Sequence, residues 1–163
     1  MTARLILVCL LLAPGLAAAQ STQEIFHIAR SKNKNVVRYD ARIGKDGQLD
    51  PKEPVVSYWL QPDGRTRKME AFDRTFFYGF KVRKAKDGDY WHFTIAAAKG
   101  RPMKLYVKDG KPRAEGKIAG TWAIVQKFYV KFKEGTTIPG VSYIDLFGID
   151  ATTGAPRRER VVP

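Results

Sequence analysis

The chain has 163 residues, a net charge of +13 and one cysteine, and 44% of its residues are hydrophobic. This length suffices for one domain with a packed core, and a lone cysteine excludes an intramolecular disulfide framework. The positive charge indicates attraction to anionic partners such as phospholipid, lipopolysaccharide or other polyanions. The alternative is a well-solvated basic surface that keeps a monomer soluble.

Residues 1–19 have the pattern of a secretory signal peptide. Arg4 provides the positive start, residues 5–12 form an apolar run, and Ala19 ends a small-residue cleavage signal. The apolar run is too short for a membrane span, which needs about 20 residues. Cys9 lies inside this run rather than after it, which argues against a lipoprotein. We therefore expect a periplasmic or secreted protein that starts after Ala19, with no cysteine and a net charge of +12 once Arg4 is lost.

The rest of the chain, residues 20–163, predicts a single all-β domain. Turn signals recur at short intervals between runs rich in Val, Ile, Tyr, Phe and Trp. Apolar and polar residues alternate within these runs, as in antiparallel strands with one wet face. The strands are expected at residues 24–30, 35–43, 54–61, 76–84, 90–98, 103–108, 113–119, 122–133 and 141–149.

About nine short antiparallel strands predict a β-barrel or a barrel-like sandwich, with at most one short helix, around residues 68–75. The alternation also predicts which side chains point inward in the later strands. These are Phe76, Tyr78, Phe80, Val82, Trp122, Ile124, Phe128, Val130, Phe132, Val141, Tyr143, Phe147 and Ile149. A barrel of about eight strands can hold one small ligand or be filled by its own side chains, and the sequence leaves both possibilities open.

Residues 43–54 resemble part of a calcium-binding EF-hand loop. Such a loop needs oxygen ligands at its first and third positions and a helix on each side. Those positions hold Arg42 and Gly44, and both flanking segments read as strands. We therefore predict a turn at Asp46-Gly47 and neither a metal site nor a cofactor.

Catalysis has little support in the sequence. The two histidines, His27 and His92, each lie inside an expected strand. His27, Ser31 and Asp40 lie close together in the sequence, but their spacing matches no hydrolytic motif. No catalytic residue is predicted.

Residues 29–35, ARSKNKN, are more polar than a hairpin requires. One interpretation is a structured loop, because Asn side chains bond their own backbone. The other is a polar mouth that offers hydrogen-bond donors to an anionic or carbonyl-bearing ligand. A later stretch, residues 127–133, alternates aromatic and basic residues. We interpret it as a solvated strand face, and we do not expect nucleic acid as a partner.

The segment from Ile25 to Leu60 and the later Phe77-Tyr78-Gly79 resemble an exported bacterial family catalogued as domain of unknown function 4833. Its most specific part is the Ser-x-Asn-x-Asn-x-Val-x-Tyr-Asp pattern. The resemblance implies one exported β-rich domain and brings no reaction with it. It draws attention to Ser31, Asn33, Asn35, Tyr39, Asp40 and Trp59.

The function expected from these patterns is that of a binding module for an apolar or amphipathic small molecule. Its candidate ligand-binding residues are Arg30, Ser31, Asn33, Asn35, Tyr39, Asp40, Trp59 and Tyr78, with Phe76, Trp122 and Tyr143 as further aromatic walls. One alternative is a basic interaction protein that binds an anionic component of the cell envelope, and a second is an uncharacterised enzyme. We expect a monomer without a transmembrane segment.

Overall fold

The computed structural model of the chain describes residues 21–134 and 140–163. The expected signal peptide, with Cys9 and the cleavage point at Ala19, lies outside the described residues, as does the segment 135–139. Among the described residues, no helix is long and apolar enough to cross a lipid bilayer.

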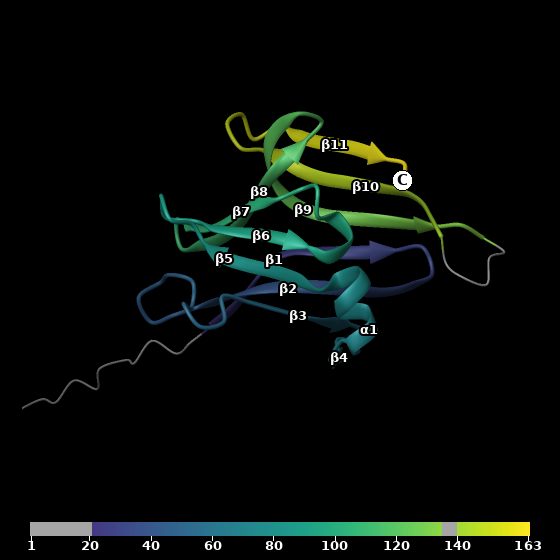
Figure 1. Cartoon of the computed structure of the whole chain (residues 1–163), viewed down its shortest axis with the longest axis horizontal. Helices are drawn as coiled ribbons and strands as arrows, with labels where there is room; N and C mark the ends of the chain where they lie inside the picture. Colours follow the sequence, from purple (N-terminus) through teal and green to yellow (C-terminus); the bar gives the residue numbers. More distant parts are fainter. Residues whose placement is uncertain (1–20, 135–139) are drawn as a thin grey trace, which may run out of the picture.

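The described residues form eleven strands of one curled sheet (Figure 1). Nine strands follow the order β4-β3-β2-β1-β9-β8-β7-β6-β5, while β10 pairs with β9 and β11. The curled sheet has the shape of a half-barrel, which confirms the all-β, barrel-like fold predicted from the sequence. The strands are β1 (Ser21–Arg30), β2 (Asn33–Ile43), β3 (Val55–Leu60), β4 (Thr66–Arg67), β5 (Phe80–Lys84), β6 (Trp91–Ile95), β7 (Met103–Lys108), β8 (Lys111–Ile118), β9 (Thr121–Phe132), β10 (Val141–Asp150) and β11 (Pro156–Val161).

The long strand β9 joins the two halves of the sheet. Its first residues pair with β8 and its later residues, from Lys127 to Val130, pair with β1, while β10 runs along its other edge. The β1–β9 pair is parallel, which the sequence pattern did not predict; every other pair of strands in the described sheet is antiparallel.

The concave side of the half-barrel is filled by the protein's own side chains. Phe26 stacks on Tyr39 with ring centroids 4.7 Å apart, and Phe93 meets Phe26 edge-on at 5.8 Å. Burial of a large apolar side chain stabilises a fold by about 1.5–3 kcal/mol. The filled interior therefore leaves hollows only at the ends and on the outer surface of the described residues. The largest fully buried side chains are Tyr39, Phe26, Phe93, Leu105, Ile118, Val37 and Val125.

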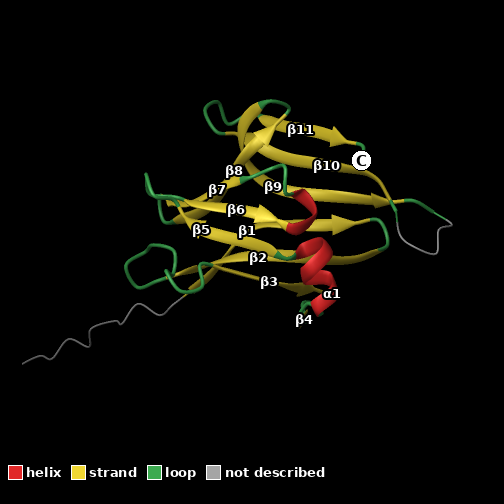
Figure 2. Ribbon diagram, viewed as in Figure 1, coloured by secondary structure: helices red, strands yellow, loops and turns green. Residues whose placement is uncertain are grey.

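Two short helical segments lie at one end of the half-barrel (Figure 2). α1 (Ala71–Asp73) continues directly into η1 (Arg74–Tyr78), and η2 (Ala96–Ala98) follows β6. The backbone N–H of Ala96 donates to the carbonyl of Gly79 at 2.7 Å, so the start of η2 is tied to the end of η1. We call this part of the molecule the helical end.

The helix expected around residues 68–75 is present, shifted toward the C-terminus. It winds the chain through Phe76 and Tyr78, so the prediction that strand 76–84 begins there is wrong, and β5 starts at Phe80. Gly79 makes this exit possible. A Cβ atom at that position would lie 1.8 Å from the carbonyl oxygen of Arg74.

In β9 the inward face is predicted correctly for Phe128, Val130 and Phe132, which are buried. The prediction is wrong for Trp122 and Ile124 and for much of β10, because each strand carries an irregularity. Between Val125 and Lys127 the register with β10 shifts by one residue, and such a bulge reverses the alternation of faces. Ala123 and Val125 are therefore buried, while Trp122 points outward with 41% of its surface exposed. In β10, Leu146 belongs to the core and Ile144 packs against it, whereas Tyr143 and Phe147 face outward beside basic side chains.

The turn expected at Asp46-Gly47 is present between β2 and β3. The Asp46 carboxylate accepts a hydrogen bond from the backbone N–H of Gln48 at 3.0 Å. Gly44 and Gln48 close the turn with a backbone hydrogen bond of 2.7 Å. Gly47 has φ of 75°, a conformation that glycine adopts without strain.

Candidate functional site

Four of the predicted ligand-binding residues meet at the helical end. The Arg30 guanidinium lies over the Trp59 ring, 4.1 Å from its centroid. Tyr78 meets Trp59 edge-on at 5.2 Å, and the Tyr39 hydroxyl donates to the Tyr78 carbonyl at 2.7 Å. The Trp59 indole N–H donates to Asp73 at 3.2 Å. We call these five residues the arginine cluster; the sequence analysis missed Asp73, which is the contribution of α1.

Burial keeps the two tyrosines of the arginine cluster protonated. Burial raises the pKa of the Tyr39 hydroxyl well above its ordinary value. It also raises the pKa of Tyr78, although the nearby positive charge of Arg30 lowers that pKa in part. Both phenols are thus neutral at physiological pH. The Nε atom of Arg30 is buried and has no hydrogen-bond acceptor among the described residues. An unsatisfied buried donor is costly, and this cost lowers the net stabilisation that the stacking of Arg30 on Trp59 provides.

The other predicted residues do not join the cluster. Ser31 accepts a hydrogen bond from the backbone N–H of Phe132 at 3.0 Å and donates its own N–H to Val130, which ties the β1–β2 turn to β9. The Asn33 side chain accepts from the backbone N–H of Asn35 at 3.1 Å. These contacts fit the interpretation of residues 29–35 as a structured loop.

Asp40 is buried away from the arginine cluster. It accepts hydrogen bonds from Arg38 and from the Tyr58 hydroxyl, each at 2.7 Å. Burial, followed by the hydrogen bond to Asp40, raises the pKa of Tyr58 to about 12. His27 bonds Glu24 at 2.8 Å. His27, Ser31 and Asp40 therefore each have a different partner, and they form no catalytic triad.

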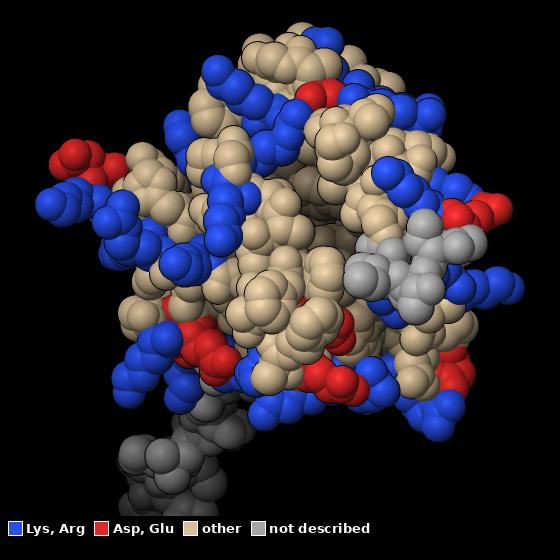
Figure 3. All heavy atoms as spheres, turned by 45° about the vertical axis from the view of Figure 1, so that its right-hand side comes forward, with Lys and Arg blue, Asp and Glu red and all other residues tan. Residues whose placement is uncertain are grey.

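An apolar groove of about 340 Å³ lies between η2 and the strands β9, β10 and β11. Phe128, Ile144 and Leu146 form its floor. Figure 3 shows the helical end from outside: its centre is hollowed between uncharged side chains, and Lys and Arg, with fewer Asp and Glu, surround it. The other lining residues of the groove are Ala97, Ala98, Lys99, Gly100, Arg101, Val161 and Pro163.

The two basic residues of this groove differ in whether a carboxylate of the protein already neutralises their charge. Arg101 forms two hydrogen bonds with Glu159, which also accepts from the backbone N–H of Ala119 at 2.7 Å. The hydrogen bond from Arg101 lowers the pKa of Glu159, so the pair stays ionised and Arg101 is neutralised. Lys99 is exposed and has no ion-pair partner within the part of the chain that the structure describes. It is the free cation at the rim.

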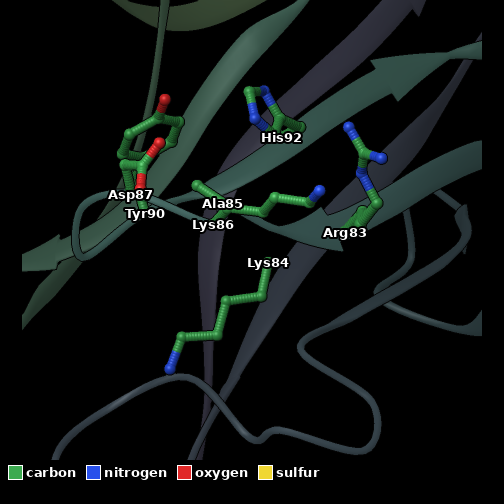
Figure 4. A pocket seen from close by; sticks show the side chains of 7 residues that line it. All are labelled: Arg83, Lys84, Ala85, Lys86, Asp87, Tyr90 and His92. Atoms are coloured by element: carbon green, nitrogen blue, oxygen red, sulfur yellow. The ribbon is translucent and has the colours of Figure 1, made fainter.

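A second, basic pocket of about 340 Å³ lies at the opposite end, on the β5–β6 hairpin. Arg83 and His92 face each other across the two strands. Figure 4 shows Lys86 turned toward these two side chains, whereas Lys84 points to the other side of the strand. Asp87 is the acidic residue of this lining. Several donors around one hollow suit an anionic group such as phosphate or carboxylate.

The described residues form an all-β half-barrel with a hollow at each end. The family model described as Domain of unknown function (DUF4833) matches residues 26–160, which is nearly the whole described chain. The chain therefore belongs to this family, as the sequence resemblance predicts. No curated protein and no solved structure matches it.

Proposed function

We propose that this protein is an exported binding module for an amphipathic small molecule, and that the groove beside η2 is its ligand site. The observation that carries the proposal is the apolar lining of this groove with one free cation, Lys99, at its rim. Ligand pockets combine apolar walls with a few placed polar groups and have volumes of about 300–1,000 Å³. The chemistry fits a molecule with an aliphatic body and an anionic head.

The filled interior supports an outer site. Phe26, Tyr39 and Phe93 occupy the space in which a barrel of this kind would hold a ligand. The arginine cluster lies at the same end of the molecule, where its contacts hold β1, β3 and the helical segment together.

Titration calorimetry with dodecanoate tests this proposal. In the variant Ala98→Trp, a large ring fills the groove, and we expect affinity to fall by about tenfold or more. Lys99→Glu should weaken binding because it replaces the free cation with a carboxylate, which repels the anionic head of the ligand. Lys131→Glu is the matched control, since Lys131 pairs with Glu134 on the outer face of β9. Equal affinity of Ala98→Trp and the unchanged protein would show that the groove is not the site.

A second function is favoured by the basic pocket of Figure 4: attachment to an anionic component of the cell envelope. Arg83, Lys86 and His92 gather there with little compensating negative charge. We expect the double variant Arg83→Ser, Lys86→Ser to lose binding to lipopolysaccharide at low salt, and Lys84→Ser, on the other side of the strand, to keep it. Loss of dodecanoate binding in the double variant would contradict two separate sites.

A further inference from the structure

Two phenylalanines protrude from the helical segment without a partner that covers them. Phe72 is 63% exposed and Phe76 is 59% exposed. They lie one helical turn apart, with ring centroids 5.0 Å from each other. Phe77, in the same turn, packs inward against the core. Adjacent exposed large apolar side chains mark an interaction surface in a soluble protein.

The segment that carries these rings is fixed to the half-barrel. Asp73 accepts the indole hydrogen bond of Trp59, and Thr75 bonds the carbonyl of Ala71 at 2.9 Å. Gly79 and Ala96 join its end to η2. The two rings are therefore held outward by a supported helix, and their exposure belongs to the fold itself.

The charge around the pair is positive. Lys68 and Arg74 are exposed and have no ion-pair partner among the described residues. Of the two nearby carboxylates, Glu70 pairs with Arg67 at 3.3 Å, and the half-buried Asp73 accepts the indole hydrogen bond of Trp59, so the net charge of the segment from Arg67 to Phe76 is positive. Figure 3 shows uncharged side chains at the centre of this face, surrounded by many Lys and Arg and by fewer Asp and Glu. Aromatic side chains flanked by cations suit the boundary between anionic headgroups and acyl chains.

We propose that α1 and η1 dock this protein on an anionic lipid bilayer, with Phe72 and Phe76 inserted among the lipids and Lys68 and Arg74 against the headgroups. The docked protein would hold its helical end, and the groove beside η2, at the lipid surface. This inference goes beyond the proposed ligand site and does not depend on it, because the two rings are not part of the groove lining.

Co-sedimentation of the exported chain with lipid vesicles tests the docking. We expect binding to vesicles of phosphatidylcholine with 30% phosphatidylglycerol to be about tenfold tighter than to pure phosphatidylcholine, at about 0.1 M salt. The double variant Phe72→Ser, Phe76→Ser should bind the anionic vesicles about tenfold more weakly. Trp122→Ser is the control, because Trp122 is an exposed aromatic residue outside the helical segment. It should bind as the unchanged protein does.

Further variants separate the explanations. Lys68→Ser with Arg74→Ser should lower binding to anionic vesicles and leave the weak binding to phosphatidylcholine unchanged. Ala98→Trp should bind vesicles normally, so that failure of the ligand site and failure of the docking are distinguishable. Unfolding by urea checks that the double phenylalanine variant is folded. Unchanged vesicle binding by that variant would overturn the proposal. So would self-association without vesicle binding, if the same two substitutions abolish it, since a second copy would then cover the rings.

Discussion

At the scale of single residues, the contact between Arg30 and Trp59 links the start of the chain to the helical end. A guanidinium over an indole ring contributes about 0.5–2 kcal/mol. We expect Arg30→Ala to lower the free energy of unfolding by about 1–2 kcal/mol. Arg30→Lys should cost less, because it keeps the charge but loses the planar stacking. Urea denaturation measures both.

Arg42→Ala is the control for this prediction. Arg42 pairs with Glu53 at 2.8 Å near the surface, and exposed ion pairs contribute about 0–1 kcal/mol. If Arg30→Ala and Arg42→Ala cost the same, the stacking on Trp59 does not stabilise the fold.

The hydrogen bonds between Asp145 and two arginines should make the stability of the fold depend on pH. The hydrogen bond from Arg160, and then that from Arg158, hold the pKa of this carboxylate well below its ordinary value, although burial acts in the opposite direction. Both arginines lie 2.8 Å from its oxygens. Because the folded-state pKa is lowered, its stabilising effect is complete above the ordinary carboxyl pKa of about 3.9 and is lost as the pH falls through and below that value.

We therefore expect Asp145→Asn to be less stable than the unchanged protein at pH 6, and this difference to narrow at pH 3. Midpoints of urea unfolding at the two pH values measure it. Asp109→Asn serves as the comparison, since Asp109 is exposed and only 3.6 Å from Arg113. A difference for Asp145→Asn that stays constant between pH 6 and pH 3 would contradict the assigned role of the two arginines.

At the scale of elements, the helical segment depends on its exit at Gly79. A methyl group there would collide with the Arg74 carbonyl, and such overpacking typically costs about 1–3 kcal/mol. We expect Gly79→Ala to lower stability by at least this amount and to displace η1. Gly100→Ala should be nearly neutral, because no atom lies within 4 Å of the position of its added Cβ. Guanidinium unfolding of both variants tests the prediction, and equal stability would refute it.

The alternation of apolar and polar residues predicted the positions of most strands, because each of these strands has one face on the core. The phase of alternation was wrong where the register shifts, at Gln126 in β9 and near Ser142 in β10. A bulge leaves no signal in a period-2 pattern. β11 was not predicted because its sequence, PRRERV, is charged at four consecutive positions. Its arginines pair with Asp145 and Asp150 across the sheet, and only the fold reveals those partners.

The candidate sites also differ in whether the local sequence or only the fold reveals them. Arg30, Trp59 and Tyr78 were predicted from local composition and do meet in the fold. The groove beside η2 was not predicted, since it combines residues of three strands and a short helical turn. Ile144 and Leu146 line this groove. Because of the bulge in β10, simple alternation places these two residues on the wrong face of the strand.

At the scale of the whole molecule, the filled half-barrel separates two ends of different chemistry. The helical end combines the apolar groove, the arginine cluster and the exposed pair of Phe72 and Phe76. The opposite end carries the basic pocket around Arg83 and His92. The positive net charge of the chain favours anionic partners at both ends.

Native mass spectrometry of the protein purified gently from its own cells tests the central claim, that the groove beside η2 holds an amphipathic ligand. We expect a monomer that carries one small aliphatic acid or phosphate, identified by its mass. Ala98→Trp, purified in the same way, should lose that adduct while remaining folded. An adduct that persists in Ala98→Trp, or a protein that carries no such molecule and also fails to bind dodecanoate, would contradict the claim.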